Sequence, residues 1–190
     1  MPKVKGSRIN AQFSYIKDNY GPEKLAAVMD VLSPLDRSTL TRVSDPAWYP
    51  AKLYERLVLA ICDVVAPKDD SALENIGRCT ADEMLTKTYK ALRGRDPHEM
   101  LGNFVPIHQL MNQPAEMKAA MVSAGRLEIK VIQPKSTPAL CSVAAGFYKR
   151  SMEMAGGYGV TLDHTKCFGR GDEFCLYELS WSAATRARGR

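Results

Sequence analysis

The sequence contains no long apolar segment and no motif of a common enzyme class. The first residues, MPKVKGSRINAQ, are polar, and no uncharged apolar run approaches the roughly 18 residues that span a bilayer. Glycine-rich phosphate loops, the G-x-S-x-G elbow, the H-E-x-x-H metal motif and recognisable nicotinamide or flavin sites are also missing. We therefore expect a cytoplasmic protein without a membrane span, and we do not expect an enzyme.

The charge of the chain is only weakly biased. Lys and Arg number 26 against 21 Asp and Glu, a net charge of +5. The two signs are interleaved, zinc-finger spacings and aromatic RNA-binding motifs are missing, and part of the excess comes from Arg186, Arg188 and Arg190. We expect no direct binding of nucleic acid, and we interpret residues 182–190 as a basic flexible tail.

Enough apolar residues remain for a sizeable core. Hydrophobic residues make up 45% and charged residues 25% of the 190 positions, which suits one domain over residues 1–190. Five cysteines at irregular spacings, without a secretion signal, indicate thiols or metal ligands and not a disulfide framework.

Residues 8–120 are predicted to be mainly helical. Apolar residues recur at helical spacing in five segments between breakers and start signals. These signals are Gly21-Pro22, Ser33-Pro34, Asp45-Pro46, Pro67, Asp70-Ser71, Gly94, Asp96-Pro97 and Pro114. The segments form the predicted N-terminal helical layer.

The pattern changes in residues 121–181. Apolar and charged residues alternate on both sides of Ala124-Gly125, which predicts a β-hairpin over 121–131. A helix is predicted from Pro138, followed by a second hairpin over 158–181. This hairpin-helix-hairpin order predicts an α+β fold with a small antiparallel sheet.

Two C-terminal segments carry a resemblance to a known family. The segments "CSVAAGFYKRSMEMAGG" and "CFGRGDEFC" resemble the 4-vinyl reductase (V4R) domain, related to Golgi transport-particle (TRAPP-like) subunits and to haem nitric-oxide-binding domains. The likeness covers residues 139–181 and is greatest to sensor domains of bacterial aromatic-responsive regulators. It implies a non-catalytic sensory module that binds a small apolar or aromatic ligand and signals through a protein partner.

The resemblance also implies a structural zinc ion. In those sensor domains a cysteine on the helix and two cysteines of the last hairpin bind zinc together with a glutamate. By position the ligands here would be Cys141, Cys167 and Cys175, with Glu128 as the fourth. Three thiolates suit a tetrahedral zinc site, although buried cysteines also serve as small hydrophobes.

The two remaining cysteines and His164 are not part of the predicted ligand set. Cys62 and Cys79 lie among apolar neighbours and are predicted to belong to the core. His164, which alternates with Leu162 on a predicted strand, is a spare metal ligand.

A ligand cavity of roughly 300 to 1,000 Å³ is expected between the helices and the sheet. Its predicted wall consists of Phe104, His108, Met111, Phe147 and Tyr148. His108 is read as a core histidine, as a group that hydrogen-bonds a phenol-like ligand, or as a haem ligand. Haem is not expected, because the Tyr-x-Ser-x-Arg propionate clamp of the haem nitric-oxide-binding domains is replaced by Val131, Ile132, Gln133, Pro134 and Lys135.

Three functions therefore stay open. The sensor is preferred; the alternatives are an adaptor that dimerises around a filled core and a haem-based gas sensor that uses His108. Family relatives pair through helical faces, and Trp48-Tyr49 suits an apolar dimer surface or a core. We expect a homodimer.

Overall fold

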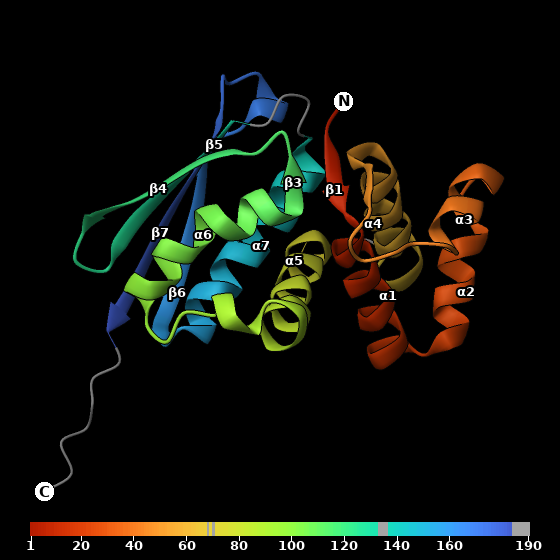
Figure 1. The fold of residues 1–190 in the computed structure, drawn as a ribbon, viewed down its shortest axis with the longest axis horizontal. Helices are drawn as coiled ribbons and strands as arrows, with labels where there is room; N and C mark the ends of the chain where they lie inside the picture. Colours follow the sequence, from red (N-terminus) through yellow and green to blue (C-terminus); the bar gives the residue numbers. More distant parts are fainter. Residues whose placement is uncertain (68, 70, 133–136, 184–190) are drawn as a thin grey trace, which may run out of the picture.

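The computed structural model describes residues 1–67, 69, 71–132 and 137–183 (Figure 1). Its helices are α1 (Gly6–Tyr20), α2 (Pro22–Asp30), α3 (Pro34–Leu40), α4 (Ala51–Val65), α5 (Ala72–Glu83), the π-helix η1 (Met84–Thr88), η2 (Lys90–Leu92), α6 (Pro97–Met111), α7 (Pro138–Met154) and η3 (Phe168–Arg170). Its strands are β1 (Lys3–Lys5), β2 (Trp48–Pro50), β3 (Asn112–Gln113), β4 (Glu116–Ser123), β5 (Arg126–Ile132), β6 (Gly157–Lys166) and β7 (Cys175–Ala183). Most of the predicted tail, 184–190, and the replaced clamp residues 133–135 lie outside the described residues.

Helix boundaries follow the local signals in the sequence. Gly21, with φ of +85°, ends α1, and Pro22 begins α2. The carboxylate of Asp96 accepts a hydrogen bond of 2.9 Å from the backbone N–H of Glu99, and this N-cap begins α6. The capping signals at these two places are confirmed.

Two predicted helix boundaries differ from the structure. Ser33 caps an additional helix, α3, by accepting a hydrogen bond from the backbone N–H of Asp36, whereas the sequence indicated only a helix end there. The helix expected from Asp45-Pro46 begins at Ala51, because Trp48–Pro50 pair with β1 as β2.

A three-stranded sheet with the order β2-β1-β3 was missed by the sequence pattern. Its strands have only two or three residues, too few to show alternation. Val4 pairs with Tyr49 on one side and with Asn112 on the other. The sheet therefore holds the start of α1 against the end of α6.

The larger sheet confirms the predicted α+β fold and its hairpin-helix-hairpin arrangement. Its antiparallel strands have the order β4-β5-β7-β6, and α6 and α7 cover one face (Figure 1). Leu127, Ile129 and Val131 are buried under these helices. The first hairpin begins at Glu116, five residues before the predicted start.

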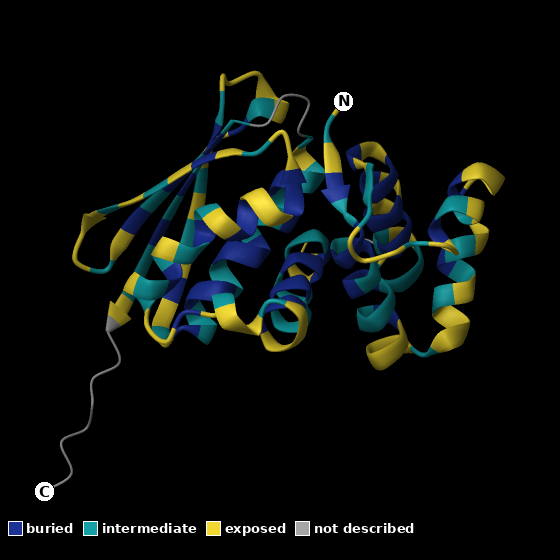
Figure 2. Ribbon diagram, viewed as in Figure 1, coloured by how far each residue is buried: buried dark blue, intermediate teal, exposed yellow. Residues whose placement is uncertain are grey.

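Helices α5 and α7 pack against each other backbone to backbone. A Cβ atom on Gly77 would collide with the carbonyl of Val143, and one on Gly146 with the carbonyl of Glu74. Buried residues accordingly line both sides of this contact (Figure 2). The contact joins the helices of the N-terminal part to the C-terminal sheet.

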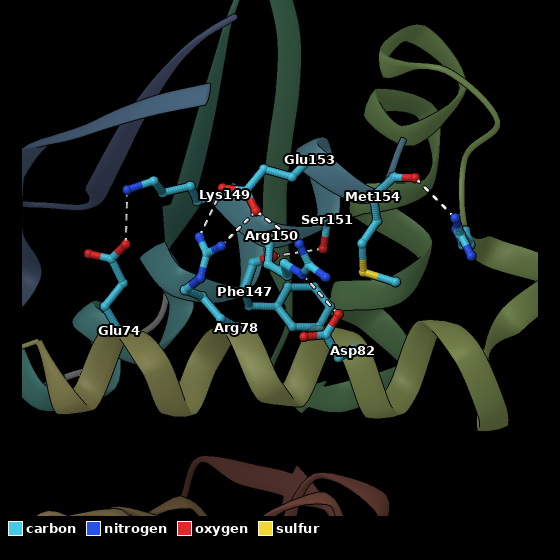
Figure 3. Close-up of polar contacts among 10 residues, drawn as sticks. Glu74, Arg78, Asp82, Phe147, Lys149, Arg150, Ser151, Glu153 and Met154 are labelled. Atoms are coloured by element: carbon cyan, nitrogen blue, oxygen red, sulfur yellow. Dashed lines mark hydrogen bonds and ion pairs between the residues drawn. The ribbon is translucent and has the colours of Figure 1, made fainter. Parts of the chain in front are cut away.

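Ion pairs border the contact between α5 and α7 (Figure 3). Arg78 donates two hydrogen bonds, of 2.9 and 2.7 Å, to the carboxylate of Glu153. Arg150 contacts both Asp82 and Glu153. Partly exposed pairs of this kind contribute at most about 1 kcal/mol each, so the glycine contact decides how closely the helices approach.

No helix in the described part of the chain is both long and apolar enough to cross a membrane.

Candidate metal centre and ligand cavity

The turn between β6 and β7 brings two cysteines together. Asp172 closes this turn, because its carboxylate accepts a hydrogen bond of 2.7 Å from the backbone N–H of Cys167. Gly171 has φ of +101°, a conformation that favours glycine. The backbone N–H of Phe168 donates to the sulfur of Cys175 at 3.4 Å, so the cysteines lie at the neck of the hairpin.

The first turn of α7 supplies a third cysteine. Gly169 approaches Pro138 so closely that a Cβ atom would lie 2.6 Å from the proline Cδ, and this approach sets the start of α7 against the hairpin turn. The Sγ atom of Cys141 is 3.4 Å from that of Cys175 and 3.6 Å from that of Cys167. The structure therefore brings together the three cysteines that the sequence singled out.

The fourth potential ligand is His164. One ligand atom from each of Cys141, His164, Cys167 and Cys175 lies within 4.8 Å of the others. The His164 ring stacks on Tyr177, with ring centroids 4.3 Å apart. Its Nε2 atom is buried and has no hydrogen-bond partner among the described residues.

Glu128 does not join this group. It pairs with Glu178 across β5 and β7, whereas Cys175 pairs with Val131. Because side chains alternate between the two faces of a sheet, Glu128 lies on the face opposite Cys175. Among the described residues, His164 and not Glu128 therefore lies close to the three sulfurs.

The spacing and ionisation of these groups suit a soft divalent metal. Tetrahedral zinc with Zn–S bonds of about 2.3 Å separates its sulfurs by about 3.8 Å, close to the distances in this cluster. Burial lowers the pKa of His164 and so favours the neutral imidazole that binds metals. Burial raises the pKa of the Cys167 thiol, whereas the hydrogen bond with Cys141 lowers that of Cys175.

A cavity lies beside this cluster, between α1, α6, α7 and the sheet. It is lined by Val4, Arg8, Phe104, Ile107, His108, Met111, Asn112, Val131, Leu140, Ala144, Phe147, Tyr148, Cys175 and Tyr177. All five predicted wall residues are among them. The cavity volume is about 50 Å³, well below the predicted range.

Aromatic rings occupy much of the space between the helices and the sheet. Tyr148 makes edge-to-face contacts with Phe104 and Tyr177, with ring centroids 5.5 and 5.1 Å apart. The Tyr177 hydroxyl donates a hydrogen bond of 3.3 Å to the backbone carbonyl of Cys141. The cavity and the cysteine cluster therefore share Tyr177.

His108 is the buried polar group of the cavity. Its side chain is only 5% exposed, and burial, assisted by the charge of Arg8, lowers its pKa to about 4. The imidazole is therefore neutral at pH 7. Its Nε2 atom has no hydrogen-bond partner among the described residues.

Arg8 and Asn112 determine which nitrogen of His108 carries the proton. A guanidinium NH group of Arg8 donates to Oδ1 of Asn112 at 2.6 Å, and this bond turns the amide NH₂ of Asn112 toward His108. That NH₂ lies 3.3 Å from Nδ1 and 3.1 Å from the carbonyl oxygen of His108. We assign Nδ1 as the acceptor of this NH₂, which places the proton on Nε2 and gives the cavity-lining ring an N–H donor there.

Sequence reasoning missed Arg8 and Asn112. The two residues are 104 positions apart and meet only because β1 pairs with β3. A single arginine near a helix start and a single asparagine after a helix carry no local signal.

Comparisons with known proteins identify the fold. No family model matches the chain, and no curated protein sequence matches it. An H-NOX protein of Shewanella oneidensis in the Fe(II)NO state has 13% identity and a TM-score of 0.71, covering 94% of this chain and 99% of its own. A mutant of that protein in the Fe(II) state has 11% identity and a TM-score of 0.76, covering 97% and 100%. The unliganded Fe(II) H-NOX protein of K. algicida has 14% identity and a TM-score of 0.69, covering 97% and 100%. The chain therefore has the α+β fold of H-NOX proteins.

The comparisons support the related haem nitric-oxide-binding fold that the sequence suggested. The V4R assignment stays a prediction. The residues of the cavity fit haem only in part. His108 offers a buried nitrogen, but iron needs a lone pair where this tautomer has a proton, and ligating imidazoles normally donate their other N–H to an acceptor. The cavity, of about 50 Å³, is also too small for a macrocycle.

Proposed function

We propose that the chain is a non-catalytic sensory module that binds a small ligand at His108 and signals through a protein partner. The observation that carries the proposal is the Nε2 atom of His108, which is buried and has no hydrogen-bond partner among the described residues, on a side chain 5% exposed that lines a cavity. A buried polar atom without a partner costs about 1–3 kcal/mol, so a ligand that bonds it gains binding energy. The H-NOX fold agrees with a sensory role by analogy.

The adaptor alternative has less support. An adaptor that uses its core only for packing has no need of a buried donor facing a cavity. The homodimer and the cytoplasmic location stay predictions.

Native mass spectrometry of the intact chain purified from its own host tests the sensor proposal. We expect a bound small molecule that is lost in His108→Ala and kept in His98→Ala, a control at the exposed start of α6. If neither the wild type nor a screen of small ligands yields binding at the cavity, the adaptor becomes the better proposal.

A haem-based gas sensor is the second candidate. The H-NOX structures solved in Fe(II) and Fe(II)NO states favour it, and so does the buried position of His108. Titration of the reduced chain with haem is the direct test. A Soret band that appears with the wild type and is lost in His108→Ala would show that His108 binds haem and not another small ligand.

We also propose that Cys141, His164, Cys167 and Cys175 bind a structural zinc ion. Their ligand atoms lie within 4.8 Å of one another, and the three cysteine side chains are 1–2% exposed. Four protein ligands leave no position for a substrate, which is typical of a structural site. Zinc would join the β6–β7 hairpin to the first turn of α7.

A further inference from the structure

Two residues that line the cavity each have a buried hydrogen-bond donor without a partner among the described residues. One is Nε2 of His108, which carries the ring proton because Asn112 donates to Nδ1. The other is Nε of Arg8, which is buried and has no hydrogen-bond partner among the described residues. Both atoms donate, so a group that satisfies them must accept hydrogen bonds.

The charge of Arg8 is also without an acidic partner. Arg8 forms no ion pair in the described part of the chain, and its polar contacts are the amide of Asn112 and the ring of Tyr54, 4.6 Å from the guanidinium carbon. Among the described residues that line the cavity there is no Asp or Glu. A partly buried guanidinium favours an anion, and a carboxylate matches its planar donors.

The position of Arg8 is fixed by the fold. β1 pairs with β3, and this pairing places the first turn of α1 beside Asn112. The ring of Tyr54, which is fully buried, holds one face of the guanidinium. The donor arrangement therefore exists before a ligand binds, which lowers the entropic cost of binding.

Resting on the sensory function proposed above, we infer that the ligand is a small carboxylic acid, bound as its carboxylate by Arg8 and His108. Its apolar part would lie against Phe104 and Tyr148. The cavity volume of about 50 Å³ corresponds to roughly four water molecules. This size favours short-chain acids or one aromatic ring over a lipid.

Calorimetric titration with benzoate and with its uncharged analogue benzamide tests this inference on the full chain. We expect benzoate to bind at least tenfold more tightly than benzamide. Arg8→Gln should abolish that preference, Arg8→Lys should restore part of it, and Arg42→Gln, at an exposed arginine, should leave it unchanged. Circular dichroism melting confirms that each variant is folded.

The outcomes separate the ligand class from the sensory function. If benzamide binds as tightly as benzoate, or Arg8→Gln keeps the preference, the carboxylate inference is wrong while the sensor proposal stands. If neither compound nor any other small ligand changes the NMR signals of the Met111 methyl group in the cavity wall, both proposals fail. Should Arg8→Gln not fold, the comparison of benzoate with benzamide in the wild type and in Arg8→Lys still decides the matter.

Discussion

Two histidines in this molecule share one feature and differ in their polar neighbours. His108 on α6 and His164 on β6 each have a buried Nε2 atom without a hydrogen-bond partner among the described residues. Around His164 lie three thiols, which become soft anionic ligands when a metal binds. Around His108 lie Arg8 and the NH₂ group of Asn112, which only donate. The neighbours, and not the histidine, decide whether an imidazole suits a metal or an anion.

Loss of the metal from the His164 site should have the largest effect on stability. We expect Cys175→Ser to lose bound zinc and about 4 kcal/mol of unfolding free energy, a fall of roughly 10 °C in the melting temperature. Metal analysis and thermal melting with and without a chelator measure both changes. Cys62→Ser, a half-buried cysteine outside the cluster, is the matched control.

The metal proposal fails if wild type prepared with zinc holds no stoichiometric metal, or if a chelator leaves its melting unchanged. In that case the three cysteines are packed core, and the contrast between the two histidines disappears.

Protonation of His108 should make the unfolding free energy depend on pH. The pKa is about 4 in the folded chain and about 6.5 when unfolded, so the unfolded chain binds the proton more readily between these values. Stability contributed by the neutral ring is present above pH 6.5 and is lost as the pH falls toward 4, by about 3 kcal/mol.

Urea unfolding between pH 4 and 7 measures this loss. His108→Leu should have the shallower dependence, because the difference from wild type isolates His108 from the carboxylates and from His164. His98→Gln should match the wild type. Parallel curves for wild type and His108→Leu would show that His108 is not held neutral by burial.

The sequence predicted more of the His164 site than of the His108 site, for a physical reason. The cysteines lie on a hairpin and at a helix start that are marked by local signals, Gly171 and Pro138. The choice between Glu128 and His164 depends on strand register, which the sequence did not resolve. At the His108 site, the wall residues on α6 and α7 follow helical periodicity. Arg8 and Asn112, however, meet through a three-stranded sheet whose strands are too short to be predicted from the sequence.

The substitution with the smallest expected effect on stability, Asn112→Asp, gives the sharpest test of the contrast between the two histidines. It keeps the shape of the side chain but replaces the NH₂ donor by a carboxylate oxygen. The new carboxylate can still accept from Arg8, as Oδ1 of Asn112 does at 2.6 Å, and it can also accept from Nδ1–H of His108. The ring proton should therefore move from Nε2 to Nδ1, and the pKa of His108 should rise because a negative charge lies beside it.

Nitrogen-15 NMR of the histidine ring measures that change directly. We expect the Nε2 proton in the wild type and the Nδ1 proton in Asn112→Asp. The unfolding free energies should lie within about 1 kcal/mol of each other, because the ion pair with Arg8 offsets the lost amide contact and the repulsion between the new carboxylate and the His108 carbonyl oxygen, 3.1 Å from the wild-type NH₂. Benzoate should bind the variant more weakly, since one donor has become a lone pair and Arg8 has gained an anion. Asn75→Asp, at an exposed position on α5, adds the same charge elsewhere and should change neither. A wild-type ring that already carries its proton on Nδ1 would contradict the assignment, and His108 would then have the tautomer of a metal ligand, like an imidazole bound to haem iron.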